Sequence, residues 1–135
     1  MSFTSLQPGD LYPEPGLYTH AFASPLDGKQ LVVVSGQLGI RRDGSIHEDL
    51  EGQFVQTYDN LRTVLKAAGG EFGDIVSLRT YLSRAELLPE FHALRKRHYP
   101  AWFAQAAPPN TLLVVTQLYR PDLWIGIEAL ALVAG

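Results

Sequence analysis

The sequence predicts a single α+β domain in which a mixed β-sheet carries two helices on one face. Several stretches alternate apolar and polar residues with the period of a strand, and two others repeat apolar residues with the period of a helix. The helical stretches lie between pairs of extended ones, which favours one mixed sheet. With 135 residues, of which 46% are hydrophobic, the chain suffices for one core, so we treat residues 1–135 as one domain.

The first third of the chain is predicted to contain an irregular segment followed by two paired strands. Prolines and glycines punctuate residues 1–15, which favours an irregular lead-in. Residues 17–23 alternate and residues 31–34 are apolar, so we expect two strands joined by a turn. In the tripeptide Ser35-Gly36-Gln37 that follows, the glycine allows either a β-bulge or the close approach of a ligand to bare backbone.

Two helices and a third main strand are predicted for the middle of the chain. From Asp49 the apolar residues recur with helical spacing, and Gly69-Gly70 end this first helix because glycine accepts a positive φ. Residues 74–82 return to strand alternation. We expect the second helix to begin near Pro89, since proline suits a first helical position, and to end at Pro100.

The last third is predicted to be a β-hairpin. Apolar runs at residues 111–118 and 123–133 flank a polar loop at 119–122, and Pro108-Pro109 mark where extended pairing begins. One carboxylate, Glu128, interrupts the second run. Burying an ionised carboxylate costs roughly several kcal/mol unless it is paired. Glu128 is therefore either a salt-bridged structural residue or a residue of a pocket.

An uncovered sheet face predicts self-association. If both helices pack on one face, the opposite face exposes Leu, Val and Trp side chains with no helix to cover them. We therefore expect this face to be an association surface between copies of the chain.

Composition and short motifs exclude several other classes. The absence of cysteine excludes a disulfide framework and a thiolate metal site, and the spacing of the four histidines predicts no metal site. A net charge of -3 gives no general attraction to nucleic acid, so the basic run Arg95-Lys96-Arg97-His98 is expected to be solvated helix surface. The first residues lack the features of a signal peptide and no apolar run reaches the length of a membrane span, so we expect a cytoplasmic protein.

Several short motifs resemble those of the RidA (YjgF/YER057c/UK114) family. In chain order they are Pro15-Gly16-Leu17-Tyr18-Thr19-His20-Ala21, Ser35-Gly36-Gln37, Gln56-Thr57, Asn60-Leu61, Ala67-Ala68-Gly69, Asp74-Ile75-Val76 and Ile125-Gly126-Ile127-Glu128-Ala129-Leu130-Ala131. The resemblance covers nearly the whole chain. It implies a chorismate-mutase-like fold and a homotrimer with pockets between subunits. Family members with known activity hydrolyse reactive imines and enamines, such as 2-aminoacrylate, and need no metal or bound cofactor.

The resemblance also implies the residues of a pocket. Tyr18, Gly36 and Glu128 occupy positions that match the family pocket, in which a glutamate of the last strand lies near the attacking water. Glu128 is thus the expected catalytic residue. Tyr18, Gly36 and the adjacent Ser35 are expected to contact the substrate.

The arginine with which the family holds the substrate carboxylate is absent. It belongs to a Pro-x-Arg pattern, and here Asn110, followed by Thr111, stands at its place; both are candidate substrate contacts. A neutral amide loses the bidentate, charge-assisted pair, which should weaken carboxylate binding by about 10²-fold or more. Arg95 on the second helix or Arg79 on a strand could supply the charge, and the alternative is that each is structural or solvated.

These observations predict a protein that hydrolyses an imine, an enamine or a related C=N compound in a cleft between subunits. Because the carboxylate-binding arginine is missing, we expect weak or no activity on 2-aminoacrylate. A trimer that binds or scavenges a metabolite without turnover is the alternative, and an endoribonuclease is a more remote one. No cofactor and no nucleic-acid or membrane partner is expected.

Overall fold

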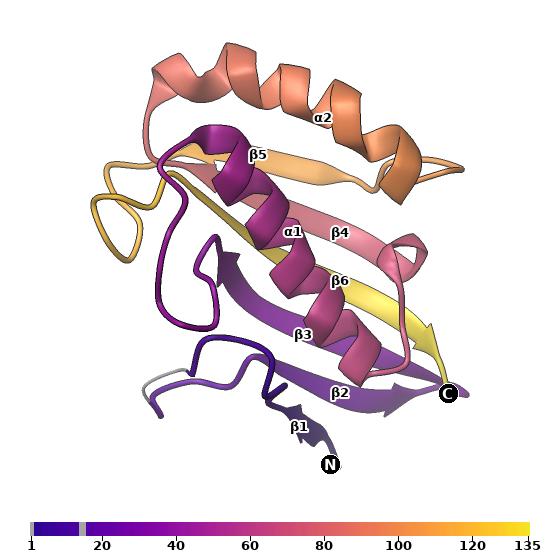
Figure 1. Cartoon of the computed structure of the whole chain (residues 1–135). Coiled ribbons are helices and arrows are strands. Elements are labelled where there is room, and N and C mark those ends of the chain that lie inside the picture. Colours follow the sequence, from indigo (N-terminus) through magenta and orange to yellow (C-terminus); the bar gives the residue numbers. More distant parts are fainter. Residues whose placement is uncertain (1, 14–15) are drawn as a thin grey trace.

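The computed structural model describes residues 2–13 and 16–135 and consists of one β-sheet with two α-helices packed against it (Figure 1). In chain order its strands and helices are β1 (Thr4–Leu6), β2 (Ala21–Leu26), β3 (Lys29–Leu38), α1 (Leu50–Ala67), β4 (Ile75–Leu82), α2 (Leu88–Trp102), β5 (Asn110–Val114) and β6 (Ile125–Ala134). Short 3-10 turns precede β4 and α2, at Phe72–Asp74 and Ala85–Leu87. No helix in the described ranges has the length and apolar character to cross a membrane.

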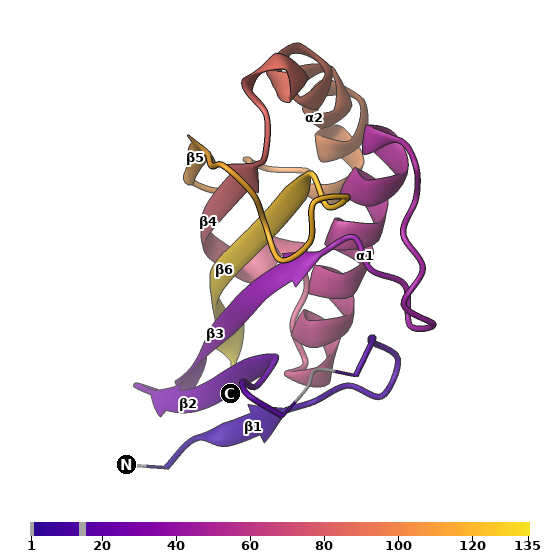
Figure 2. The same cartoon turned by 90° about the vertical axis from the view of Figure 1, so that its left-hand side faces the viewer.

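The strands form a six-stranded sheet in the order β1-β2-β3-β6-β4-β5. Its neighbours are antiparallel except β4 and β5, which run parallel and are connected through α2. Viewed from the side, both helices lie on the same face of the sheet (Figure 2). The predicted fold class, a mixed sheet with two helices on one face, is confirmed.

The predicted hairpin between the last two strands is wrong. β5 pairs with β4 at the edge of the sheet, whereas β6 lies between β3 and β4, so β5 and β6 are not neighbours. The extended conformation predicted for the second apolar run is correct, and the odd-numbered residues of β6 are buried. In the middle of the sheet, the backbone N–H and C=O groups of β6 find partners on both edges, which a terminal hairpin would not provide.

The predicted irregular lead-in is wrong in part, because it contains β1. Thr4 and Leu6 pair with Ala23 and Ala21 of β2, and the Phe3 ring stacks on Phe22 with centroids 4.3 Å apart. The prolines of this segment follow β1 and do not interrupt it. The strand expected at residues 17–23 begins only at Ala21, and the Pro15 end of the family-like motif lies outside the described residues.

The second helix begins as predicted but ends two residues later than Pro100. Pro89 lies in its first turn, while Pro100 lies in its last turn, and the helix ends at Trp102. A proline in the last turn removes one backbone donor, and aromatic packing offsets this loss. The Trp102 ring lies 4.7 Å from that of Tyr58 on α1, so continuing the helix places an aromatic side chain against the core.

Alternation along the strands separates a helix-covered face of the sheet from an open face. On the covered face, Phe54 of α1 and Phe91 of α2 are fully buried with ring centroids 5.8 Å apart. On the open face, Phe22, Val33 and Leu130 are cross-strand neighbours and are 38%, 47% and 39% exposed. This apolar row lies where the association surface was predicted, and the homotrimer itself stays a prediction.

Candidate functional site

The candidate site is organised by an irregularity in β3. The register between β3 and β6 shifts between Val34 and Gln37, so that Ser35 and Gly36 together lie opposite Glu128. This is the β-bulge that was one of the two alternatives for the glycine. Gly36 is exposed, and a Cβ atom there would meet no heavy atom within 4 Å. The bulge therefore also presents bare backbone with open space in front of it.

Ser35 fastens the segment before β2 to the edge of β3. Its backbone N–H donates to the carbonyl oxygen of His20 at 2.8 Å, and its hydroxyl donates to the carbonyl oxygen of Thr19 at 2.5 Å. Both bonds hold the backbone next to Tyr18, which brings the Tyr18 ring to the same cavity as Gly36. The hydroxyl proton of Ser35 is engaged with Thr19. Ser35 therefore forms part of the cavity wall, and its two hydrogen bonds position Tyr18.

A cavity of about 290 Å³ opens at this edge of β3. Its walls are Tyr12, Pro13, Tyr18, Ser35, Gly36, Leu38, Ile40 and Tyr119. A smaller space of about 40 Å³ shares several of these residues and is also bordered by His20, Gln37 and Asn60. His20 and Gln37 belong to the motifs quoted above, so those motifs could have indicated them. Tyr119 could not be found, because its loop was expected only to close a hairpin.

Glu128 lies on the open face of the sheet, in one cross-strand row with Arg79 and Thr111. Arg79 pairs in register with Glu128 on β6 and with Thr111 on β5. Arg79 Nη1 donates to Glu128 Oε1 at 3.1 Å, and the Tyr81 hydroxyl donates to the same oxygen. The Glu128 side chain remains 37% exposed. Glu128 is therefore a paired carboxylate that water can reach, next to a hollow of about 150 Å³ on the same face.

The hydrogen bond to Glu128 raises the pKa of Tyr81 above 10.0. Ionisation of the phenol would remove the donated proton and place two negative charges together, which is the physical reason for this direction. The pKa of Arg79 is also raised, first by its hydrogen bond with Tyr81 and then by that with Glu128. At neutral pH the three side chains thus form a donor-acceptor cluster that fixes one carboxylate oxygen of Glu128.

Asn110 and Thr111 point to opposite faces of the sheet. Asn110 pairs in register with the buried Leu78, and its Oδ1 accepts a hydrogen bond from Thr80 at 2.9 Å. This places the amide on the helix-covered side, whereas the exposed Thr111 shares the open face with Glu128. Within one chain, therefore, Asn110 lies away from the predicted catalytic carboxylate.

Arg95 lies in the helix layer, away from both hollows. Its guanidinium covers the Phe91 ring at 5.0 Å and contacts His92 Nδ1 at 2.6 Å, and both of these residues belong to α2 as well. Of the two arginines considered as replacements for the family arginine, Arg79 is thus the one that lies beside Glu128. The structure places Ser35 and Gly36 opposite Glu128, with Tyr18 at the adjoining cavity. Thr111 shares the open face but lies two strands from Glu128, and Asn110 and Arg95 lie outside this group.

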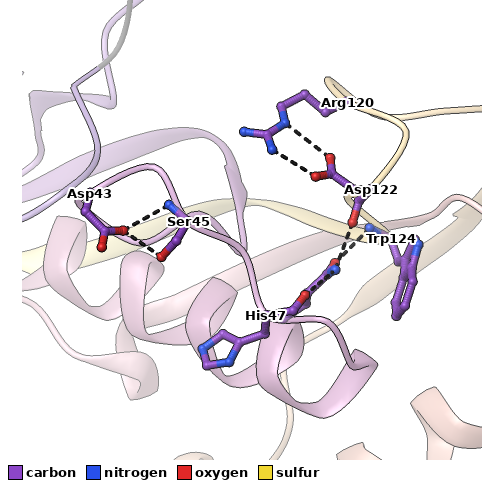
Figure 3. Close-up of polar contacts among 7 residues, drawn as sticks. Asp43, Ser45, His47, Arg120, Asp122 and Trp124 are labelled. Atoms are coloured by element: carbon purple, nitrogen blue, oxygen red, sulfur yellow. Dashed lines mark hydrogen bonds and ion pairs between the residues drawn. The ribbon is translucent and has the colours of Figure 1, made fainter.

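A buried amide ties the loop that carries Tyr119 to α1. Gln53 is 1% exposed, and its Nε2 donates to the carbonyl oxygens of His47 at 3.1 Å and Asp122 at 2.9 Å. Its Oε1 accepts from the backbone N–H of Trp124 at 2.8 Å (Figure 3). These contacts fix residues 122–124. They thereby hold the loop that places Tyr119 in the cavity wall.

The cavity at Gly36 can hold a planar group against bare backbone, and Glu128 lines a separate hollow in which its carboxylate reaches water. The carboxylate is Glu128 and the backbone is that of Gly36, directly across the β3–β6 ladder. Within residues 2–13 and 16–135, no group of three or more His, Asp and Glu side chains is arranged to hold a metal ion. The Glu128 carboxylate can take up and return a proton, and Arg79 and Tyr81 supply hydrogen bonds to it.

The fold and this cavity define a small α+β domain with a candidate small-molecule site at the bulge of an inner strand. The sequence profile of the family described as Endoribonuclease L-PSP matches residues 16–133. The chain therefore belongs to this family, the RidA/YjgF family that its motifs resemble. The predicted recognition is confirmed at the level of the family.

Individual relatives agree with this assignment. The "RutC family protein YjgH" of Escherichia coli is 36% identical over 110 residues, which are 82% of each chain. A "2-iminobutanoate/2-iminopropanoate deaminase" of Salmonella typhimurium is 28% identical over 114 residues, covering 82% of this chain and 85% of that protein. The crystal structure of RidA from Psychrobacter sp. PAMC 21119 superposes with a TM-score of 0.79 at 22% identity, over 95% of this chain and 98% of that one, which confirms the fold.

Proposed function

We propose that this protein hydrolyses the C=N bond of a small imine, or of the enamine in equilibrium with it. The observation that carries the proposal is the placement of Glu128 opposite the bare backbone of Gly36, on a water-accessible face. The naming of a relative as an imine deaminase supports the reaction class. Water adds to the imine carbon, and the resulting carbinolamine loses ammonia to leave the carbonyl compound.

Glu128 has the position of a general base and acid in this reaction. A carboxylate can take a proton from the attacking water and return it to the departing nitrogen. Arg79 and Tyr81 donate to one of its oxygens, which fixes the orientation of the carboxylate. We assign Arg79 and Tyr81 as positioning residues.

We further propose that substrates with an α-carboxylate are turned over weakly. Asn110 is uncharged and lies on the helix-covered side, where its Oδ1 accepts from Thr80, and the charge of Arg79 is already paired with Glu128, so neither offers an unpaired positive charge to a second carboxylate. A substrate carboxylate would have to share the Arg79 charge with Glu128, so it would be attracted more weakly than by an unpaired guanidinium. Activity on 2-aminoacrylate should accordingly be low compared with an uncharged imine.

We propose that the working form is a homotrimer in which a neighbouring chain completes the cleft. The apolar row formed by Phe22, Val33 and Leu130 is the surface that such an assembly would cover. One chain has a mass of 14.9 kDa, and sedimentation equilibrium should give three times this mass. A stable monomer at micromolar concentration would refute the shared cleft.

One observation favours a second candidate, a trimer that binds a metabolite without turnover. Glu128 is held by both Arg79 and Tyr81, as a structural carboxylate would be. In this case the same cavity would retain a ligand, and the carboxylate would only stabilise the sheet.

Glu128→Gln separates the two candidates. Ammonia release should be measured on a panel of imines generated in situ by an oxidase, with Glu86→Gln as a control, because Glu86 is 70% exposed and lies on the turn before α2. Loss of kcat by about 10²-fold or more in Glu128→Gln alone, with ligand binding retained, supports hydrolysis. Absence of turnover by the wild type on the whole panel, with ligand affinity unchanged in Glu128→Gln, supports the binder.

A further inference from the structure

The walls of the cavity at the β3 edge are aromatic and aliphatic. Three of its residues are tyrosines, Tyr12, Tyr18 and Tyr119, and Leu38 and Ile40 supply much of the rest. None of the described residues in these walls carries a charged side chain. The faces of phenol rings attract other aromatic rings in offset or edge-to-face contact, so walls of this kind favour a planar apolar ligand.

Two arginines next to these walls are engaged elsewhere. Arg120 follows Tyr119, but its Nε and Nη2 bind the carboxylate of Asp122 at 3.1 and 2.8 Å (Figure 3). Arg41 follows Ile40 and donates to Ser45 at 2.8 Å. A ligand carboxylate in this cavity would exchange water for apolar groups and would meet no charged side chain among the described wall residues of the chain, which disfavours an anion.

Two uncharged amide side chains, Gln37 and Asn60, border the smaller space beside the cavity, and their N–H donors are hydrogen-bonded. Gln37 Nε2 donates to the carbonyl oxygen of Ser35 at 3.1 Å and lies 3.4 Å from His20 Nδ1. Asn60 Nδ2 donates to the carbonyl oxygens of Leu38 and Ile40. An uncharged amide gives an ionised ligand group no ion pair to offset its desolvation.

Gly36 leaves room for a ring. Neither its backbone conformation nor packing requires glycine, since its φ lies outside the positive range and a Cβ atom would meet nothing within 4 Å. Its missing side chain therefore adds open space to a cavity of about 290 Å³. A cavity of about 150 Å³ is enough for benzene, so a ring with a short polar substituent fits.

We infer that this cavity takes a neutral ligand with an aromatic ring. It follows that the substrate is an uncharged imine or enamine bearing such a ring, hydrolysed to the corresponding carbonyl compound and ammonia; this second step rests on the proposed function. Such a substrate differs from small imino acids in having an aromatic ring and no negative charge.

Matched probes test the charge and the ring separately by titration calorimetry on the whole protein. Phenylacetamide is neutral and aromatic, phenylacetate has the same size with a negative charge, and acetamide lacks the ring. Phenylacetamide should bind at least about tenfold more tightly than either of the others. Phenylacetate or acetamide binding as tightly as phenylacetamide would overturn the inference.

Gly36→Val tests the location. The added carbons should fill the space against the ring and weaken phenylacetamide binding by about tenfold or more. Gly73→Val is the matched control, because Gly73 also has open space at its Cβ position, has no positive φ and lies outside the cavity walls. Unchanged affinity in Gly36→Val would refute this location.

A second pair of variants keeps the test valid if Gly36→Val fails to fold. Tyr119 is 68% exposed, so Tyr119→Ala should leave folding intact and weaken phenylacetamide binding, whereas Tyr119→Phe keeps the ring and the affinity. Equal affinity of both Tyr119 variants would count against the aromatic wall. If no imine is turned over while the probe preference holds, only the proposed function fails. If small imino acids are turned over without any preference for phenylacetamide, the present inference and the proposed weak turnover of α-carboxylate substrates fail, while the proposed hydrolysis of a C=N bond stands.

Discussion

Replacing Gln53 should test how the two loops at the cavity are held together. Gln53→Leu keeps a side chain of similar size in a fully buried position but removes both amide donors and the acceptor. The carbonyl oxygens of His47 and Asp122 and the N–H of Trp124 then lose their partner. An unsatisfied buried polar group costs about 1–3 kcal/mol, and because these contacts are partly buried we take about 1 kcal/mol for each.

The expected loss in the free energy of unfolding is therefore about 3 kcal/mol. Urea unfolding followed by tryptophan fluorescence measures it, at one protein concentration because assembly would shift the midpoint. Gln56→Leu is the control, since Gln56 lies on the same helix, is partly exposed and makes one hydrogen bond, to Asn60. A loss below about 1 kcal/mol in Gln53→Leu, or an equal loss in the control, would refute the reasoning.

Two further predictions concern the contact between the helices. Phe54→Ala should cost about 3–5 kcal/mol in urea unfolding, because a fully buried ring leaves a cavity between α1 and α2; a cost below about 1 kcal/mol would contradict the assigned core. Arg97 and then His98 donate to Glu51 and lower its pKa below the ordinary 4.5. The stability that Glu51 contributes is present above 4.5 and is lost as the pH falls through the lower folded pKa. In Glu51→Gln, the urea concentration at the unfolding midpoint should therefore fall less steeply than in the wild type as the pH is lowered below 4.5. An equally steep fall would contradict the ion pair.

The local elements of this fold could be predicted from the sequence because their signals are local. Helix α1 begins after the N-cap residue Asp49, whose carboxylate accepts from the backbone of Gly52, and the chain turns at Gly69 with φ +80°. The period of two residues in a strand places the odd-numbered residues of β6 on one face, and in the structure these residues are buried. Periodicity and end signals depend on residues within one element, and therefore they do not depend on the rest of the fold.

The order of the strands and the composition of the site were decided by contacts between residues far apart in the sequence. Apolar alternation states which face of β6 is buried, but not whether its edges meet β5, β3 or β4. The pairing of Arg79 with Glu128 and the turning of Asn110 toward Thr80 depend on that order, because a cross-strand neighbour exists only once the strands are in register. Glu128 could therefore be singled out from the sequence as an embedded carboxylate, whereas its partners and its position opposite Gly36 came from the tertiary structure.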